Sequence, residues 1–413
     1  MNPNRQQDDT LNLLIAGKLQ GSTNLKLQCD LTEFPAEIFS LADTLEILDL
    51  SGNALSSLPD DLDKLRKLRI LFCSSNQFTH LPEVLGKCQN LSMIGFKANQ
   101  ISHISESAIP TQALRWLILT DNALSKLPNS IGDCQHMQKL MLAGNQLKVL
   151  PEHLKNCKKL ELLRISANQL ESLPDWLFSL PKLSWLAYAG NPFSDDIEQN
   201  LIRQHEINHI DWQTLTLKNI LGEGASGITY QAIWRPANQA SQQVAVKLFK
   251  SELTSDGLPR CEMHANILAG EHPNLVGIKG IIHNHPQGSM GLVMPLLDRD
   301  LKVLANPPSF ESCSRDVYAQ ELKLTYEEVQ HILHGITQAS EHLHAQGLMH
   351  GDLYAHNILW NTKKVVLSDL GGASFLPLDN PDLSQKLLKL ETRALAVLAE
   401  ELQKTIVKWQ LVR

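Results

Sequence analysis

The 413-residue sequence lacks an excess of basic residues, which argues against a nucleic-acid-binding protein. It contains 37 Lys and Arg residues against 44 Asp and Glu residues, so its formal net charge is −7 at pH 7. Domains that bind nucleic acid are usually basic. The basic residues gather only in short runs such as Lys155–Lys159, which are typical of a solvated surface.

Long apolar runs are also missing. No stretch approaches the roughly 18 consecutive apolar residues that a membrane-spanning helix needs, and the first residues, MNPNRQQDDT, are polar. These absences predict a soluble, cytoplasmic protein without a membrane span. A hydrophobic content of 43% is enough to build real cores, and the length predicts two or three domains.

Cysteines are few, seven in all, and their spacing excludes a disulfide framework. Cys88, Cys134 and Cys157 are separated by 46 and 23 residues, and Leu65 and Leu180 fall in the same 23-residue register. A position that accepts leucine as readily as cysteine is a small buried apolar position, so we expect these thiols to lie in a core.

The first half of the chain is an internal repeat of 23 residues. An asparagine recurs at this interval without interruption, at Asn53, Asn76, Asn99, Asn122, Asn145, Asn168 and Asn191. Apolar residues precede each asparagine at fixed offsets, as Leu45, Leu48 and Leu50 do before Asn53, and a Leu-Pro pair follows in most units. The pattern L-x-x-L-x-L-x-x-N resembles the leucine-rich repeat, a solenoid unit.

This resemblance implies an α/β solenoid with a curved parallel sheet. Each unit contributes one short strand whose leucines point inward, and only stacked units bury that face. The asparagine amides are expected to satisfy backbone groups of the turns. We expect an N-terminal cap over residues 1–24, with a short helix beginning at Asp8 or Asp9, and a solenoid over 25–193 that closes near Asn191-Pro192-Phe193.

The concave strand face is the expected binding surface of such a solenoid. Outward-pointing positions there carry more aromatic and large apolar residues than solubility requires, which predicts a protein partner. Alternatively, one or two of these residues pack against neighbours or against the second domain. The residues concerned are Phe72, Trp116, Ile118, Met141, Arg164 and Trp185.

A glycine cluster marks the start of a different second half. Gly222, Gly224 and Gly227 are spaced G-x-G-x-x-G, a motif shared by dinucleotide-binding folds and by loops that cover nucleotide phosphates. In a dinucleotide-binding fold the glycines open a helix. Here Ile228-Thr229-Tyr230 follows instead, which favours a hairpin of two strands and therefore a phosphate cover.

Further motifs follow in order. Lys247 ends the apolar strand VAVK, Glu262 lies in the expected helix CEMHANILAG with Glu252 as an alternative, and Asp352, Asn357 and Asp369 come later. With this spacing, residues 212–402 resemble a protein kinase domain. The resemblance implies an α+β bilobal, compact kinase domain over 212–413, joined to the solenoid by a linker over 194–211.

The kinase resemblance also implies cofactors and residue roles. ATP and Mg²⁺ are the expected cofactors, Asp352 is the catalytic base, Lys247 holds the α- and β-phosphates, and Asn357 and Asp369 hold magnesium through oxygen atoms. Met294 resembles the gatekeeper residue before the hinge. The full set of implied ATP-binding residues is Gly222, Gly224, Gly227, Ile228, Ala245, Lys247, Glu262, Met294 and Leu297.

Some positions depart from the kinase pattern. In HGDLYAHN (350–357), Gly351 replaces an arginine that in many kinases receives an activation-loop phosphate, and Tyr354 replaces a lysine common in serine/threonine kinases. Only 21 residues separate Asp369 from Glu391, which stands where an anchoring aspartate is usual, and no A-P-E segment lies between them. The activation segment is therefore expected to be short.

The whole chain thus resembles the soluble leucine-rich-repeat protein kinases of bacteria. We expect it to phosphorylate a protein hydroxyl, serine or threonine, while the repeats recruit a partner or substrate. Two alternatives stay open at this point. One is a pseudokinase scaffold, against which the intact Lys247, Asp352, Asn357 and Asp369 argue. The other is a small-molecule kinase, which Gly351 favours and the glycine loop disfavours.

Overall fold

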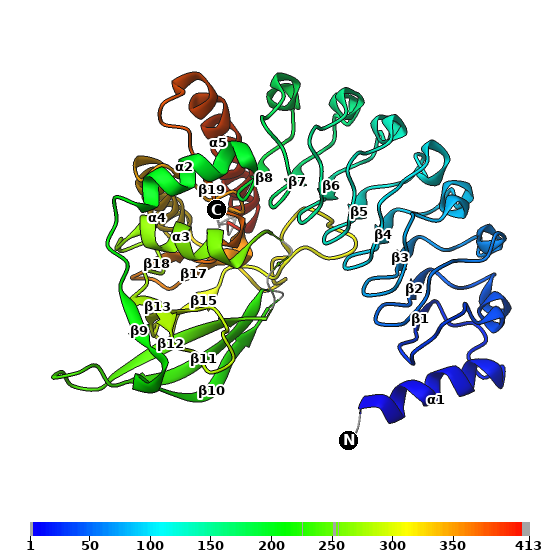
Figure 1. Ribbon diagram of the computed structural model, residues 1–413, viewed down its shortest axis with the longest axis horizontal. Coiled ribbons are helices and arrows are strands. Elements are labelled where there is room, and N and C mark those ends of the chain that lie inside the picture. Colours follow the sequence, from blue (N-terminus) through cyan, green and yellow to red (C-terminus); the bar gives the residue numbers. More distant parts are fainter. Residues whose placement is uncertain (1–2, 225, 251–252, 255, 407–413) are drawn as a thin grey trace, which may run out of the picture. The chain divides into compact units, whose positions relative to one another are not determined.

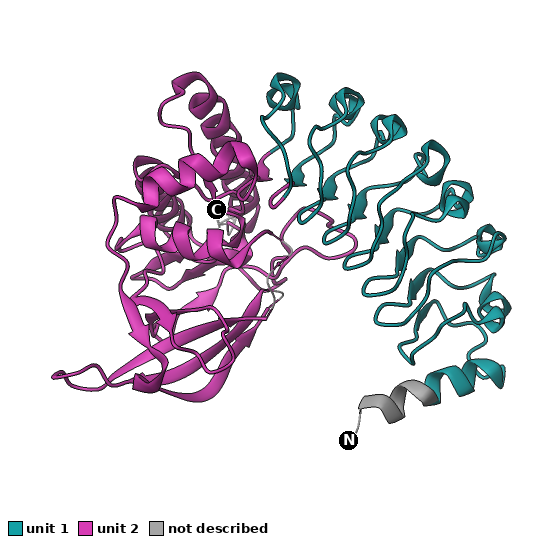
Figure 2. Cartoon of the chain, in the orientation of Figure 1, with its two compact units in different colours: residues 1–164, 168–183 teal, residues 165–167, 184–413 magenta. Residues whose placement is uncertain are grey.

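The computed structural model describes residues 3–224, 226–250, 253–254 and 256–406, with side chains from residue 9 onward. The chain divides into two compact units. Residues 1–164 and 168–183 form the first, and residues 165–167 and 184–413 form the second (Figure 2). The last repeat, which the sequence pattern assigns to the solenoid, therefore groups with the second unit.

The first unit is a regular solenoid. It contains the first seven strands of an eight-stranded parallel sheet in the order β1 to β8, and a 3-10 helix follows each of these seven strands (Figure 1). The strands are β1 Asn24–Lys26, β2 Ile47–Asp49, β3 Ile70–Phe72, β4 Met93–Gly95, β5 Trp116–Ile118, β6 Lys139–Met141, β7 Leu162–Arg164 and β8 Trp185–Ala187. The 3-10 helices are η1 Ala36–Leu41, η2 Leu62–Lys64, η3 Glu83–Lys87, η4 Glu106–Ala108, η5 Asn129–Asp133, η6 Glu152–Asn156 and η7 Asp175–Ser179.

The repeated asparagine side chains form the expected hydrogen bonds to backbone groups of their own and the neighbouring repeats, and we call this series the asparagine ladder. Asn145 Nδ2 donates to the carbonyl oxygens of Leu119 and Leu142, both at 2.9 Å, and its Oδ1 accepts from the backbone N–H of Leu124 at 3.0 Å. One side chain thereby satisfies three backbone groups that the turn leaves unpaired. Asn53, Asn76, Asn99 and Asn122 bond in the same manner.

The N-terminal cap differs from the prediction in its starting point. Helix α1 spans Pro3–Ile15 and so begins at Pro3 rather than at Asp8 or Asp9. Proline is favoured in the first turn of a helix because the N–H it lacks has no partner there. Leu14 of this helix is buried, whereas Ile15 is exposed.

The predicted binding face is only partly accessible. Phe72, Trp116, Ile118 and Met141 are half-buried, as expected of a surface that retains contact with solvent. Arg164 and Trp185 are not part of an open surface, because only 1% and 2% of each residue is exposed. Trp185 packs within the second unit, which matches the alternative role considered for such residues.

The cysteines lie in the core. Cys88, Cys134 and Cys157 are buried, and burial raises the pKa of the Cys134 and Cys157 thiols to about 12. A thiol with so high a pKa stays protonated at neutral pH and is unreactive.

The second unit begins with a mixed sheet that builds an N-terminal lobe. Six strands lie in the order β10-β11-β12-β14-β13-β9, all antiparallel except for the β9–β13 pair. Their bounds are β9 His209–Asp211, β10 Leu215–Glu223, β11 Gly227–Trp234, β12 Gln242–Phe249, β13 Gly280–His283 and β14 Gly291–Pro295. Alternate residues of these strands form one apolar core that includes Ala232, Val244, Val246 and Val293.

Helices dominate the remainder of the unit. They are α2 Pro192–Ile202, α3 Pro259–Ala269, α4 Tyr326–Ala345 and α5 Pro381–Thr405. Two small sheets accompany them, one of β15 Lys302–Val303, β17 Ile358–Trp360 and β18 Val365–Leu367, the other of β16 Leu348–Met349 and β19 Ser374–Phe375. Short 3-10 helices are η8 Trp212–Thr214, η9 Ala355–Asn357 and η10 Leu370–Gly372.

Helix α4 begins with a capping box of Thr325 and Glu328, and the apolar stripe of that helix is buried. The expected linker has a different outcome. Residues 194–211, which we expected to be a linker, instead contain most of α2 together with β9, a strand of the mixed sheet.

Within the described part of the chain, the length and apolarity of every helix fall short of what crossing a membrane requires.

Candidate active site

The glycine motif lies in a hairpin of strands β10 and β11, as its sequence predicted. A Cβ atom added to Gly222 or Gly224 would meet no heavy atom within 4 Å, so both positions border open space. A Cβ atom on Gly227 would lie 2.4 Å from the Leu248 carbonyl oxygen. Gly227 is therefore required for close packing of two strands, whereas Gly222 and Gly224 leave room beside the backbone for a ligand.

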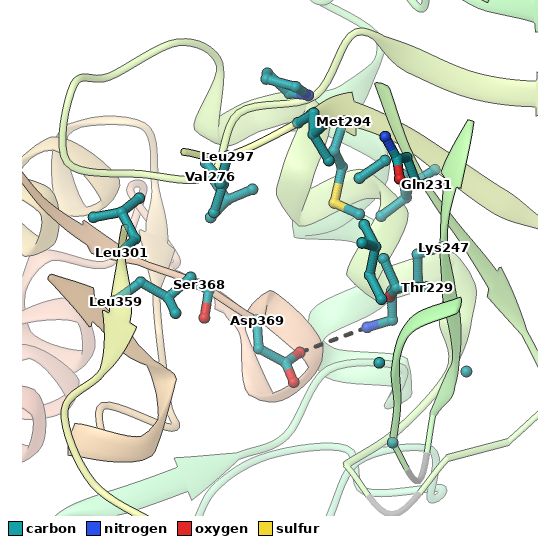
Figure 3. A pocket seen from close by; sticks show the side chains of 18 of the residues that line it. Thr229, Gln231, Lys247, Val276, Met294, Leu297, Leu301, Leu359, Ser368 and Asp369 are labelled. Carbon is teal, nitrogen blue, oxygen red and sulfur yellow. Dashed lines mark ion pairs between the residues drawn. The ribbon is translucent and has the colours of Figure 1, made fainter. Parts of the chain in front are cut away.

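Beneath this hairpin lies a cavity of about 870 Å³ (Figure 3). Eight of the nine residues predicted to bind ATP line it: Gly222, Gly224, Gly227, Ala245, Lys247, Glu262, Met294 and Leu297. Ile228 does not, and its neighbour Thr229 does. Thr229 pairs with Lys247 and Gln231 pairs with Ala245, so these four residues share the cavity face of the sheet, and strand alternation turns Ile228 to the other face.

One cation and two carboxylates meet at the end of this cavity. Lys247 Nζ lies 2.5 Å from Glu262 Oε1. It also lies 3.7 Å from Asp369 Oδ1, an ion pair that Figure 3 shows as a dashed line. Glu262, on α3, is only 4% exposed. The alternative Glu252 lies outside the described residues. The structure thus brings Lys247, Glu262 and Asp369 together from three separate elements.

Burial governs the protonation of this cluster. Burial raises the pKa of the Glu262 carboxyl to about 7, although the Lys247 ammonium opposes the rise. Burial also disfavours the charged form of Lys247, but Asp369 and Glu262 outweigh it and raise the pKa of Lys247. Lys247 therefore stays charged at neutral pH, while Glu262 titrates close to it.

The segment 350–357 is held beside the strand that precedes Asp369. The buried His350 accepts from the Asp352 backbone N–H through Nδ1, and its Nε2 lies 3.1 Å from the Ser368 carbonyl oxygen and donates to it. Ser368 in turn donates twice to the Asn357 carbonyl oxygen. Asp352 and Asn357 themselves do not line the cavity.

Two buried carboxylates fix the backbone of this segment. Glu391 Oε1 accepts from the N–H groups of His350 and Gly351 at 2.7 and 3.1 Å, which is the anchoring position predicted for it. Asp316 accepts from Ala355 N at 2.6 Å and from His356 Nδ1 at 2.6 Å. The role of Asp316 could not be predicted, because nothing in its local sequence distinguishes it from other loop aspartates.

Gly351 has a structural explanation. Its φ is +68°, a conformation that favours glycine, and an added Cβ would lie 2.3 Å from the Gly372 carbonyl oxygen and 2.7 Å from that of Leu186. An arginine at this position would clash with two backbone carbonyl groups. Tyr354 is also accounted for: it is 3% exposed and stacks on Trp185.

The ligand set fits magnesium bound together with a nucleotide. Asn357 Nδ2 donates to the backbone carbonyl and to Oδ2 of Asp352, at 2.9 and 3.3 Å, which leaves the amide oxygen of Asn357 as an acceptor. Among the residues that the structure describes, no group of three or more His, Cys, Asp or Glu side chains is arranged to hold a metal alone. Magnesium in phosphoryl-transfer sites is usually held by one or two protein side chains and the substrate phosphates.

Comparison with family models assigns both halves of the chain. The protein kinase domain model matches residues 215–392, and leucine-rich-repeat models match residues 44–65 and 135–193. The solved structure of a leucine-rich-repeat protein from Leptospira interrogans aligns with a TM-score of 0.38 and 23% identity, over 44% of this chain and 52% of that chain.

Curated relatives match part of the chain at modest identity. The probable serine/threonine-protein kinase gdt4 of Dictyostelium discoideum is 30% identical over 178 residues, which cover 40% of this chain and 9% of that protein. Cyclin-dependent kinase 11.1 of Caenorhabditis elegans is 27% identical over 157 residues, 37% of this chain and 20% of that protein. Cyclin-dependent kinase 10 of Rattus norvegicus is 27% identical, over 43% of this chain and 46% of that protein.

The matched regions thus span less than half of the length of these relatives. The family-model matches confirm the predicted leucine-rich repeats and the predicted protein kinase domain. The chain consists of leucine-rich repeats followed by a protein kinase domain.

Proposed function

We propose that the protein is an ATP-dependent kinase that transfers the γ-phosphoryl group of Mg-ATP to a serine or threonine hydroxyl of another protein. The observation that carries this proposal is the position of Lys247, paired with Glu262 and 3.7 Å from Asp369, at the end of the cavity beneath the glycine hairpin. A buried ammonium held in this way is suited to binding phosphate oxygens.

Phosphoryl transfer depends on positioning and charge neutralisation, and the chain offers a group for each task. Lys247 would hold the α- and β-phosphates, with Glu262 fixing the ammonium. The backbone at Gly222 and Gly224 borders open space and would cover the phosphates. Asp352 would orient the acceptor hydroxyl and take its proton. Its backbone N–H is fixed by His350, which favours a single orientation.

Magnesium would be held by Asp369 and by the amide oxygen of Asn357. When bound, the ion neutralises phosphate charge. Asp369 has a left-handed backbone conformation, with φ +59°, and its carboxylate accepts from Gly371 N at 3.1 Å. This conformation directs the Asp369 carboxylate toward the cavity and Lys247 (Figure 3).

The adenine ring would enter the apolar part of the cavity. Ala245 and Met294 are paired residues of β12 and β14, and Leu297 follows in the segment after β14. Pro295 lacks an N–H donor, so backbone carbonyls of this segment are the groups available there to accept from an adenine amino group.

The repeats would recruit the protein substrate or a partner. Phe72, Trp116, Ile118 and Met141 are half-buried residues of strands β3, β5 and β6, and their large apolar side chains favour a protein surface as the ligand. The bacterial likeness and the cytoplasmic location stay predictions of the sequence.

The rival proposals are weakened to different degrees. A small-molecule kinase was favoured by Gly351, but the positive φ and the adjacent carbonyl groups account for that glycine without reference to the acceptor. A pseudokinase scaffold has no need of a Lys247 ammonium that pairs with both Glu262 and Asp369, so this arrangement supports catalysis instead.

Incubation of the full chain with radiolabelled Mg-ATP tests the proposal. Label should pass to casein, a general serine/threonine acceptor, and not to kanamycin, a small-molecule acceptor. Asp352→Asn should abolish transfer, whereas Asp382→Asn, which changes a carboxylate 75% exposed on α5, should retain it. Nucleotide binding without transfer would favour the scaffold, and transfer to kanamycin alone would favour the small-molecule kinase.

A further inference from the structure

The last strand of the repeat sheet, β8, lies in the same compact unit as the catalytic loop and contacts it. Trp185 Nε1 donates to the Leu353 carbonyl oxygen at 2.9 Å. The indole ring stacks on Tyr354, with ring centroids 4.3 Å apart and planes inclined by 11°. Because Trp185 and Tyr354 are both buried, this contact joins a repeat side chain to residues 353 and 354, which directly follow Asp352.

Trp185 also connects to the loop that holds the other end of this segment. The Arg315 guanidinium carbon lies 5.2 Å from the centroid of the Trp185 ring, within range of a cation–π contact. The next residue, Asp316, accepts from Ala355 N and His356 Nδ1. Residues 353–356, between Asp352 and Asn357, are thus held by β8 and by residues 315–316 together.

The segment after β8 reaches the activation segment as well. Tyr188 N donates to Ser374 Oγ at 3.0 Å, and Tyr188 Oη donates to the Phe375 carbonyl oxygen at 2.8 Å. Ser374 and Phe375 form β19, which pairs with β16 directly before the catalytic loop. The Leu186 carbonyl oxygen occupies the space beside Gly351 where a Cβ atom would lie.

From these contacts we infer that Trp185 is a positioning residue for phosphoryl transfer, through which the last repeat holds the catalytic loop in its working geometry. The inference rests on the proposed kinase function. An arginine that could receive an activation-segment phosphate cannot be accommodated at Gly351. Instead of an arginine that binds a phosphate, Trp185 and Tyr188 donate hydrogen bonds to the carbonyl oxygens of Leu353 and Phe375. The catalytic loop therefore needs no phosphorylated residue to hold it in place.

Steady-state kinetics of full-chain variants test the inference. Trp185→Leu keeps apolar bulk and removes the stacked ring and the N–H donor, so kcat should fall by about 100-fold, the usual consequence of displacing a catalytic group by about 1 Å. The KM for ATP should stay within about twofold, because Trp185 does not line the cavity. Trp185→Phe restores a ring without the donor, so its kcat should fall by only about fivefold.

Trp176→Ala is the matched control, since Trp176 lies on η7 of the neighbouring repeat and should leave kcat unchanged. Equal activity of Trp185→Leu and wild-type protein would overturn the inference, as would a change confined to KM. If Trp185→Leu does not fold, Trp185→Phe decides the matter. Loss of the single donor should lower kcat by about fivefold without affecting KM, and an unchanged kcat would overturn the inference.

Hydrogen exchange separates this inference from the proposed function. Amides of residues 350–358 should exchange about tenfold faster in Trp185→Leu, and those of residues 140–147 should not change. If the amides of residues 350–358 exchange faster in Trp185→Leu but the wild-type protein transfers no phosphate, Trp185 holds the loop and the kinase proposal is wrong. Unchanged exchange in an active, Asp352-dependent enzyme would remove the role of Trp185 alone.

Discussion

The two units differ in how far apart in the sequence a polar side chain and its partners lie. In the repeats, Asn145 bonds to backbone groups 3, 21 and 26 residues away, and the same local solution recurs in other units. In the kinase domain, Lys247 meets Glu262 across 15 residues but meets Asp369 only because the intervening chain returns to it. Because the asparagine hydrogen bonds recur every 23 residues, the spacing in the sequence predicts them. The Lys247, Glu262 and Asp369 cluster occurs once, so no repeat in the sequence indicates which residues meet.

The largest expected effect follows from a substitution of Lys247 in the kinase domain. Lys247→Met removes the ammonium and leaves Glu262 buried without its partner, so kcat/KM should fall by about 1,000-fold. Lys218→Met, which alters an exposed lysine of β10 in the same sheet, should change kcat/KM little. Phosphate transfer assays on both proteins measure the difference, and comparable activity of the two variants would contradict the assignment of Lys247.

Gly351→Ala should rank second. The change places a side chain at a positive φ and directs a Cβ atom against two carbonyl oxygens. The free energy of unfolding should therefore fall by about 3 kcal/mol. Gly288→Ala introduces similar backbone strain in open space, because a Cβ atom there would meet no neighbour. It should cost only about 1 kcal/mol.

Urea denaturation of both glycine variants isolates the contact of residue 351 with the Leu186 and Gly372 carbonyl groups. Equal losses of stability in Gly351→Ala and Gly288→Ala would show that this contact is unimportant.

Asn145→Ala should have a smaller effect on stability, because it removes the hydrogen bonds of only one of several equivalent asparagines. The buried N–H of Leu124 and two carbonyl groups lose their partner. This loss should lower the free energy of unfolding by about 2 kcal/mol. Asn90→Ala, at an exposed position outside the ladder, should cost much less. Thermal unfolding of both proteins gives the comparison, and a loss at Asn90 equal to that at Asn145 would show that the ladder adds nothing specific.

The smallest expected effect is a pH dependence. The pKa of Glu262 is about 7, so protonation below that pH neutralises the partner of Lys247. We therefore expect kcat/KM to fall about tenfold between about pH 8 and about pH 6. Glu262→Gln should be less active throughout and should lack this decline.

As pH falls below 7, protonation of Glu262 should lower kcat/KM but increase the free energy of unfolding. The folded pKa of Glu262 lies above its ordinary value of 4.5, so its contribution favours folding at low pH and is lost as pH rises toward 7. Catalysis therefore needs the ionised form that burial disfavours. A pH–rate profile identical in Glu262→Gln and wild-type protein would assign the decline to another group.

Much of the site could be predicted because kinase motifs keep fixed local spacing. Gly222, Lys247, Met294 and Asp369 line one cavity as the resemblance implied. Ile228 lies outside the cavity lining whereas its neighbour Thr229 is part of it, since adjacent residues of a strand face opposite sides and the motif alone does not set the register. The partners of Asp316 and Trp185 could not be predicted, because they lie 39 and 168 residues away and no local pattern marks them.

The sequence by itself determined the regular repeat period, the asparagine ladder, and the glycine, lysine and aspartate motifs of the kinase domain. These depend on local spacing, which fixes which side chains share a face of a strand or a turn. Only the tertiary structure decided that the last repeat strand packs on the catalytic loop and that Gly351 must be glycine there. Such contacts arise between segments remote in sequence, where shape and burial, rather than any local period, select the residues that meet.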